Sequence, residues 1–293
     1  MSLSAQSLAE VRFAGRPAER RERLAHPHRC PGGRLPLGDD MLATHEQQFV
    51  SAVLAPSGLT AEAYRARPLR RRIAAALRSV RASDIDAGLE AVHREPGLAD
   101  RVLNTLLIGY TAPFRDEPVF QRLRDSVLPA LVTGRTGLHI WSAACSNGAE
   151  LYSVALLLAE RGCLAHSTLR GTDGRAAAIA EAPHSARTFW TSIPTPFLDL
   201  KTKRLESHFF AHAQRITWQV ENVFACTDEA RFDLILCRNL AIYLQPEAAA
   251  RLWEILARAL VPEGILITGK AEKPLPGRQW RRLDTCVYQT VQS

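Results

Sequence analysis

The sequence lacks the residue patterns that build metal centres and disulfide frameworks. Its six cysteines are scattered without a C-x-x-C pair, and its nine histidines show no H-E-x-x-H or similar ligand spacing. We therefore expect no metal site, and we expect reduced, buried thiols at Cys145 and Cys237. No apolar run approaches the roughly 18 residues of a membrane-spanning helix, so we expect a cytoplasmic protein that does not insert into a membrane.

Two glycine-rich nucleotide motifs are also missing. Neither G-x-G-x-x-G nor the phosphate loop G-x-x-x-x-G-K-S/T occurs in the chain. No segment shows the long a/d seam of a coiled coil, which favours a monomer. What is abundant is positive charge, with 37 Lys and Arg against 30 Asp and Glu and a formal net charge of +7 at pH 7. That excess favours an acidic partner.

Composition divides the chain into three parts. Residues 1–40 are rich in Arg, Pro and Gly, with prolines that interrupt any periodic pattern, and are predicted to be a disordered extension. Residues 41–108 are predicted to form a small all-helical domain, because apolar residues recur there at helical spacing. They fall on two helices, with Phe49, Val53 and Leu54 on the first and Leu69, Ile73, Leu77 and Val80 on the second.

The second of these helices is dense in arginine. Its seven arginines are Arg65, Arg67, Arg70, Arg71, Arg72, Arg78 and Arg81. A solvated helix face is the ordinary role of such a run, but charge of one sign at this density favours docking onto an acidic surface.

Residues 138–160 read as a strand, a tight loop and a helix in succession. The apolar run 138–144 suits a strand covered on both faces, and the helical spacing after Gly148 predicts an amphipathic helix. Backbone N–H groups at the start of such a helix can meet a ligand rich in acceptors. Taken alone, the pattern would more simply be an ordinary strand-to-helix turn.

A carboxylate ends the next predicted strand. Residues 169–173 read LRGTD, and Asp173 would lie beside the end of the first strand, where it could accept hydrogen bonds from the two hydroxyls of an adenosine. Asp173 could equally cap a helix over 175–182, and both roles can hold together. A further strand is predicted over 234–237.

After that strand a helix is predicted over 246–260, and 264–269 is predicted as the last strand. The alternation of strands and helices predicts an α/β fold with a mostly parallel, doubly wound sheet.

Several segments of this part resemble the CheR-type chemotaxis receptor glutamate O-methyltransferases. They read WSAACSNGAELYS, GTD, FDLILCRNLAIYL and LVPEGILITGKAEK, in the family order, and IGYTAPFRD resembles the segment before the family's first strand. The resemblance covers roughly residues 41–293. It implies a Rossmann-like class I methyltransferase domain over 109–293, a substrate-docking domain over 41–108, and S-adenosylmethionine as the cofactor, with S-adenosylhomocysteine as the product.

The resemblance also implies a set of cofactor contacts. Glu150 would meet the positively charged end of the methionine moiety, Asp173 the ribose, and Asn222 the adenine edge, although Asn222 could equally serve a turn. Gly148 would allow close approach of the backbone to the ligand. The full set is Thr111, Arg115, Gly148, Glu150, Asp173, Asn222, Val223, Arg238 and Asn239.

Arg115 and Tyr243 are the catalytic residues that the resemblance implies. A glutamate side chain is already ionised near neutral pH, with a reference pKa of about 4.3, so its methylation needs no general base. The site must instead hold the carboxylate oxygen at roughly 3 to 3.5 Å from the sulfonium methyl. Arg115 would orient the carboxylate and Tyr243 would close the site. From the residues alone, Arg115 could equally pair with Asp116 or Glu117, and Tyr243 could be a core aromatic.

The chain departs from the family pattern at Gly109, Tyr110, Pro113 and Ala149. The stretch 210–216 is also short where some family members carry an antiparallel subdomain that binds a tethering peptide of the receptor. These departures leave open a protein that binds S-adenosylmethionine for regulation and has lost catalysis.

The expected substrate is an acidic helical protein, such as the cytoplasmic domain of a chemoreceptor, docked on Arg70, Arg71 and Arg78. Nucleic acid is the competing acidic partner, which leaves a nucleic-acid methyltransferase as a third function. Against it, the loop after 234–237 reads C-R-N-L, where amino-methylating nucleic-acid enzymes carry a proline-proline-aromatic motif to stack a flipped base.

Overall fold

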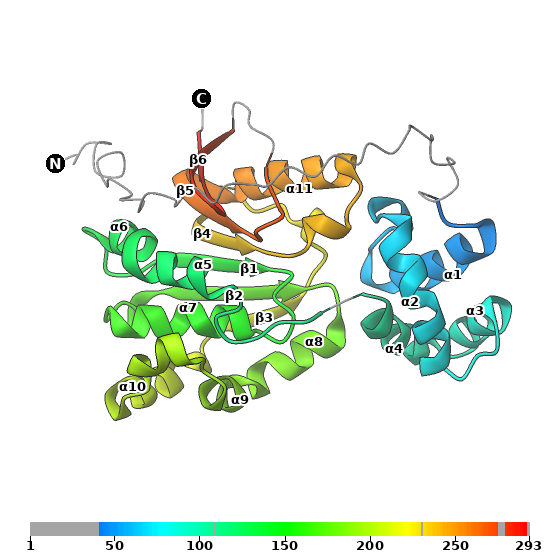
Figure 1. The fold of residues 1–293 in the computed structure, drawn as a ribbon, viewed down its shortest axis with the longest axis horizontal. Coiled ribbons are helices and arrows are strands. Elements are labelled where there is room, and N and C mark those ends of the chain that lie inside the picture. The colour runs from blue at the N-terminus through cyan, green and yellow to red at the C-terminus, as the bar shows by residue number, and fades with distance from the viewer. Residues whose placement is uncertain (1–40, 108, 230, 275–278, 292–293) are drawn as a thin grey trace, which may run out of the picture.

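The computed structural model describes residues 41–107, 109–229, 231–274 and 279–291. The disordered extension predicted for 1–40 lies outside the described residues. Figure 1 shows helices α1 to α4 beside a larger part in which helices cover a sheet.

The helical part begins at α1 and continues through two short 3-10 turns into α2. The two helices expected from the sequence are α1 and α2, and α3 and α4 pack against them. The buried residues of α2 include Leu69, Ile73 and Ala76, at the spacing that places side chains on one helix face. Asp84 caps α3 by accepting the Ala87 N–H at 2.8 Å. The bounds are α1 Thr44–Leu54, α2 Ala66–Ser79, α3 Ile85–Arg94 and α4 Pro96–Leu106.

The sheet has seven strands in the order β3-β2-β1-β4-β5-β7-β6. β7 pairs antiparallel with β5 and with β6, and the other neighbouring strands pair in parallel. The mostly parallel, doubly wound α/β sheet predicted from the sequence is therefore confirmed. The strands are β1 His139–Ala143, β2 Thr168–Asp173, β3 Thr217–Val220, β4 Phe232–Cys237, β5 Leu260–Thr268, β6 Trp280–Asp284 and β7 Val287–Thr290.

The prediction of a last strand at 264–269 is wrong. That strand, β5, begins at Leu260, and β6 and β7 follow it as an antiparallel hairpin. Neither hairpin strand has the continuous apolar run that revealed the central strands, because β6 reads WRRLD and β7 reads VYQT, each with polar residues inside a short segment.

Helices cover both faces of the sheet. On one face, Ile140, Leu234 and Ile265 pack with α5, α6, α7, α9 and α10. On the other face, Trp141, Ile235 and Leu266 pack with α11 and with residues of the helical part. The helices of the part that contains the sheet are α5 Glu117–Arg122, α6 Leu128–Val132, α7 Ala149–Glu160, α8 Ala176–Glu181, α9 Ala186–Thr191, α10 Lys203–Ala213 and α11 Pro246–Ala259.

The expectation that the helix after Gly148 is amphipathic is wrong. In α7 every residue from Ala149 to Ala159 is buried, because the sheet lies on one side and α9 and α10 cover the other. A helix that is apolar all round is typical of a fully buried position.

The short stretch 210–216 also has a plain structural consequence. α10 ends at Ala213 and β3 begins at Thr217, so a tight turn joins the helix directly to the edge strand. No antiparallel subdomain is inserted between α10 and β3, whose residues are all among those described.

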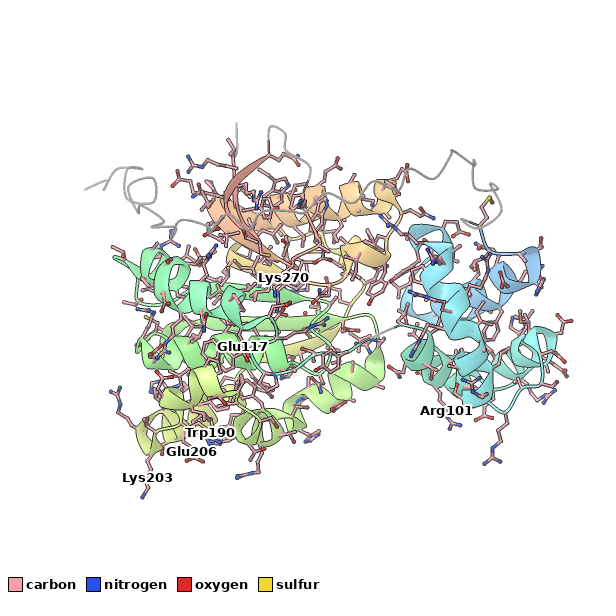
Figure 2. The ribbon with its side chains drawn as sticks, viewed as in Figure 1. Arg101, Glu117, Trp190, Lys203, Glu206 and Lys270 are labelled. Atoms are coloured by element: carbon pink, nitrogen blue, oxygen red, sulfur yellow. The ribbon has the colours of Figure 1, made fainter. Side chains whose placement is uncertain are left out.

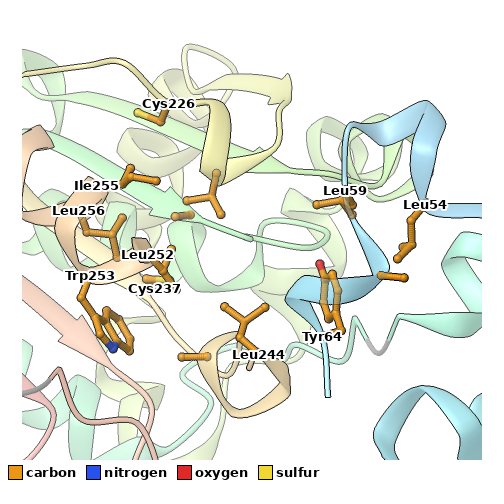
Figure 3. Packing of buried hydrophobic residues seen from close by; sticks show 14 of the residues in the cluster. Leu54, Leu59, Tyr64, Cys226, Cys237, Leu244, Leu252, Trp253, Ile255 and Leu256 are labelled. Carbon is orange, nitrogen blue, oxygen red and sulfur yellow. The ribbon is translucent and has the colours of Figure 1, made fainter. Parts of the chain in front are cut away.

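The helical part is joined to the loop after β4 by backbone hydrogen bonds. The Arg65 N–H donates to the Tyr243 carbonyl at 2.8 Å, and the Gln245 N–H donates to the Ala63 carbonyl at 2.8 Å. Between them, Tyr64 and Leu244 form an isolated antiparallel bridge. Figure 3 shows these two buried side chains at the junction, within a core that is shared by both parts.

Candidate active site

A cleft opens at the carboxyl ends of β1, β2 and β4, between the sheet and the helical part. It encloses about 1250 Å³, open solvent included. The loops that form its floor hold Ala144, Ser146 and Asn239 in the left-handed region, with φ of 57°, 55° and 62°. Such conformations are concentrated at functional sites in proteins.

Asp173 lies at the end of β2, on the floor of the cleft, with 6 % of its surface exposed. Its carboxylate accepts the Ser146 N–H at 2.9 Å and the Arg175 N–H at 2.9 Å. It also accepts the Arg175 guanidinium, from Nε at 3.0 Å and from Nη2 at 3.2 Å. Arg175 is the residue that precedes α8, so Asp173 stabilises the start of that helix while it faces the cleft.

Glu150 lies in the first turn of α7 and is also buried. Its carboxylate accepts the Ser142 hydroxyl at 2.8 Å and Arg238 Nη1 at 2.9 Å. The Arg238 side chain is 2 % exposed, and its Nη2 also donates to the Arg115 carbonyl and to Asp116 Oδ2, each at 2.7 Å. The Nε atom of Arg238 is buried and has no hydrogen-bond partner among the described residues.

Arg115 lies at the edge of the cleft and is turned toward Tyr110. Its Nη1 donates to the Tyr110 carbonyl at 2.6 Å, and its guanidinium lies 5.2 Å from the centre of the Tyr110 ring. Asp116 instead pairs with Arg238 and with Lys270, whose ammonium is 3.1 Å from Asp116 Oδ1. Figure 2 shows Lys270 in the larger part that contains the sheet. Burial acts to raise the pKa of Asp116, but the hydrogen bond from Lys270 and the charges of both cations lower it overall.

Tyr243, Thr111, Val223 and Asn239 also line the cleft. Tyr243 is half-buried in the short turn that follows the C-R-N sequence. The structure therefore brings the two predicted catalytic residues and most of the predicted cofactor contacts to one cleft.

Asn222 lines the cleft, but both ends of its amide already have protein partners. Its Nδ2 donates to the Gly58 carbonyl at 2.6 Å, and its Oδ1 accepts the Phe224 N–H at 3.0 Å. The turn role that the sequence left open for Asn222 is thus present, and its contact with adenine stays a prediction.

Gly148 is not among the residues that line the cleft. Its φ is +83°, and a Cβ atom built there would lie 2.4 Å from the ring of Trp218. Glycine is required because the backbone is left-handed and Trp218 packs against it. The backbone and Trp218 therefore account for this glycine without a ligand. The approach of a ligand to Gly148 stays a prediction.

The arginines of the helical part divide into two groups. Arg65 Nε donates to the Leu244 carbonyl at 2.9 Å, and Arg72 donates twice to the Thr105 carbonyl, so both of these cleft residues are anchored. Arg70 pairs with Glu46 at 3.2 Å. The side chains of Arg71 and Arg78, which the sequence predicts for substrate docking, are exposed.

Sequence reasoning missed several side chains of the site. Arg175 pairs with Asp173. Burial raises the pKa of Tyr64, which also lies close enough to that pair for the charge of Asp173 to raise its pKa and the charge of Arg175 to lower it. Glu272 is buried and accepts the N–H groups of Asn239, Ala241 and Gly269, each at 2.7 Å, which fixes the loop after β4. The signal for Glu272 was its place just after the last parallel strand, where a carboxylate at a cleft can be expected.

Residues 110–285, more than half of the chain, match the family model for the SAM-binding domain of CheR methyltransferases. This chain belongs to the CheR methyltransferase family. It is an S-adenosylmethionine-dependent methyltransferase of the class I fold, and the Rossmann-like domain that the resemblance implied is confirmed.

Two named relatives align with this chain over most of their own length. The chain is 25% identical over 233 residues to a chemotaxis protein methyltransferase of Listeria monocytogenes, covering 78% of this chain and 89% of that protein. It is 26% identical over 202 residues to chemotaxis protein methyltransferase 1 of Vibrio cholerae, covering 61% and 70%. Among solved structures, a magnesium protoporphyrin IX methyltransferase of Synechocystis with bound S-adenosylmethionine matches at 21% identity and a TM-score of 0.34, over 52% of this chain and 59% of that one. A score that low adds nothing to the assignment.

The residues of the cleft fit a nucleoside with a charged tail. Buried carboxylates line the cleft at the end of β2 and at the start of α7, and carboxylates are the groups to which the hydroxyls and the ammonium of such a ligand donate. In the described part of the chain, no group of His, Cys, Asp and Glu is arranged to hold a metal ion. Nor does any helix described there have the length and apolarity needed to span a membrane.

Proposed function

We propose that this protein transfers a methyl group from S-adenosylmethionine to a glutamate side-chain carboxylate of a protein, giving a glutamate methyl ester. The observation that carries the proposal is the cleft itself, which is lined by Glu150 and Asp173 and also by Arg115 and Tyr243. The names of two relatives support it, because the chemotaxis protein methyltransferases of Listeria monocytogenes and Vibrio cholerae align with this chain over most of their own length.

The chemistry asks little of the protein beyond alignment. S-adenosylmethionine, when bound, supplies an electrophilic methyl group on a sulfonium. The attacking glutamate is ionised near neutral pH, so no residue of the cleft has to remove a proton from it. What the chain must provide is a fixed position for the carboxylate and protection from water.

Arg115 suits the positioning role. A guanidinium has five N–H donors, and the bond to the Tyr110 carbonyl uses one of them while it fixes the direction of the group. Arg115 should orient the substrate carboxylate without holding it in a tight bidentate pair, since such a pair would lower the nucleophilicity of the oxygen. Tyr243 would close the other side of the cleft, on a loop that is hydrogen-bonded to Arg65.

The substrate in this proposal is an acidic helical protein, such as a chemoreceptor cytoplasmic domain, bound by a monomer of this chain. The exposed side chains of Arg71 and Arg78 would meet its carboxylates. The helical part, residues 41–108, would then act as the docking domain for the methyltransferase domain over 109–293. Nucleic acid remains the competing partner for the same charge, and salt-sensitive binding to random DNA would favour it.

Base lability gives the test. The full chain is incubated with methyl-labelled S-adenosylmethionine and a purified chemoreceptor cytoplasmic domain, and the protein product is treated with base. A glutamate methyl ester releases labelled methanol, whereas methylated amines and methylated nucleic acids do not. We expect methanol from the wild type, none from Asp173→Ala, and at least about tenfold less from Arg115→Ala, the loss of about one charge-assisted contact. Label that survives base would contradict the proposal.

A second candidate is a regulatory protein that binds S-adenosylmethionine without transferring the methyl group. Two observations favour it: the departures at Gly109, Tyr110 and Pro113, and the engagement of Asp173 by Arg175. Binding of S-adenosylhomocysteine without any base-labile product, on every receptor domain tried, would support this reading.

A further inference from the structure

The guanidinium of Arg175 takes up the acceptor positions that Asp173 would offer to a ribose. The Asp173 carboxylate accepts four donors, two from the backbone N–H groups of Ser146 and Arg175 and two from Arg175 Nε and Nη2. A carboxylate has about four lone-pair sites. No acceptor site is therefore left on Asp173 for the two hydroxyls of an adenosine.

We infer that Arg175 sets the affinity of this cleft for its cofactor by competing with the ribose for Asp173. The inference rests on the proposed S-adenosylmethionine site. When the ribose enters, Nε and Nη2 of Arg175 withdraw and the two hydroxyls donate in their place, while the two backbone donors stay. The exchange keeps the number of hydrogen bonds on Asp173 but breaks a buried ion pair.

Gly109 is matched to this arrangement. A Cβ atom at position 109 would lie 1.8 Å from Arg175 Nη1 and 2.3 Å from Cζ, so any side chain there would collide with the guanidinium. The φ of Gly109 is outside the left-handed region, so the backbone conformation does not require glycine. Glycine is needed here because a side chain would occupy the space of the Arg175 guanidinium. Gly109, a departure from the family pattern, thus makes room for the guanidinium of Arg175.

The burial of the pair makes the competition effective. Arg175 is 9 % exposed and Asp173 is 6 % exposed, so their interaction is only weakly screened by solvent. A ligand that displaces the guanidinium loses part of its binding free energy to breaking the contacts between Arg175 and Asp173. The expected consequence is a cofactor affinity lower than the carboxylate alone would give.

The test is calorimetric titration of the full chain with S-adenosylhomocysteine, comparing the wild type with Arg175→Met. Methionine keeps the length of the side chain and removes its donors. We expect the variant to bind about tenfold more tightly, the equivalent of about one hydrogen bond to a charged group. Arg187→Met, at an exposed arginine on α9, is the control and should leave the affinity unchanged.

Because Arg175→Met leaves Asp173 with fewer donors, we expect the variant to be less stable than the wild type. Arg175→Lys keeps the charge but lacks the fork of donors, and it should give an affinity between those of the other two. The thermal shift on adding S-adenosylhomocysteine gives an independent readout, and it should be larger for both variants than for the wild type.

Gly109→Ala tests the matched pair. Its methyl group would push the guanidinium off Asp173, so it should raise the affinity in the wild type and have little effect in Arg175→Met. An equal effect in both backgrounds would break the link between positions 109 and 175.

Equal or weaker binding by Arg175→Met, with normal binding by the wild type, would overturn this inference and leave the cofactor site intact. Failure of the wild type and of both Arg175 variants to bind would overturn the cofactor site and this inference together. Binding by the variants alone would support the inference in its strongest form.

Discussion

Arg238 Nη1 donates to Glu150 Oε2 at 2.9 Å, although the two residues are 88 positions apart in the chain. The contact ties the loop after β4 to the first turn of α7. Because the other Nη atom reaches the Arg115 carbonyl and Asp116, one buried guanidinium fixes three segments around the cleft. The position of Arg115, the proposed orienting residue, therefore depends on Arg238.

Replacing Arg238 with Met should destabilise the fold by about 3–5 kcal/mol, because it leaves the buried Glu150 carboxylate without its cation. Urea denaturation measures the loss. The control is Arg94→Met, since Arg94 pairs with Glu90 in a bridge whose side chains are 70% and 71% exposed. That surface pair should contribute less than about 1 kcal/mol. Equal stability of the two variants would show that Arg238 is not a structural anchor.

Glu272→Gln should weaken the loop after β4. The carboxylate accepts three backbone N–H groups, and an amide can accept at only one of its two end atoms. We expect a loss of about 2–3 kcal/mol in unfolding free energy, with weaker binding of S-adenosylhomocysteine as Arg238 and Asn239 shift. Glu254→Gln, at an exposed position of α11, should change neither quantity. Unfolding curves and calorimetric titrations of both variants decide the matter.

The sequence predicted the centre of the sheet and missed its edges, for a physical reason. β1 and β4 are covered on both faces, so their residues form apolar runs that stand out along the chain. β3 lies at one edge and has mostly exposed residues, and β6 lies at the other edge with two exposed arginines in succession. Such strands are defined by their neighbours in the sheet, which a local pattern does not contain.

The site was predictable where its residues end strands, and not where they come from elsewhere. Asp173 is the last residue of β2 and Arg238 directly follows β4, so the fold class alone places them at the cleft. Tyr64 enters from the helical part, and its place depends on the bridge to Leu244. The sequence places Arg175 only at the start of a helix. Its close approach to position 109 depends on the folded positions of two separate segments, which a local pattern does not contain.

Two glycines with similar backbones allow strain and packing to be separated. Gly148 has φ +83° and faces the Trp218 ring, whereas Gly162 has φ +73° and faces open space. Gly162→Ala should cost about 1–2 kcal/mol, from the left-handed backbone alone. Gly148→Ala should lower the unfolding free energy by about 1–3 kcal/mol more than Gly162→Ala does, because the added methyl group must displace the indole. Denaturation midpoints that are the same for both variants would exclude the contribution of Trp218.

Tyr64 should make the protein sensitive to alkali. Burial, and then the charge of Asp173, raise the pKa of Tyr64 well above its ordinary value, against a smaller opposing effect of Arg175. As the pH rises past about 10, the unfolded chain releases this proton first, so stability that is fully present below that pH is progressively lost above it. Tyr64→Phe should reduce the fall in unfolding free energy by up to about 1.4 kcal/mol per pH unit, measured with urea between about pH 8 and about pH 11. Tyr110→Phe, at a tyrosine that is 66% exposed, should leave the slope unchanged. An equal slope in the wild type and Tyr64→Phe would mean that other buried groups, such as Tyr152, carry the alkaline loss.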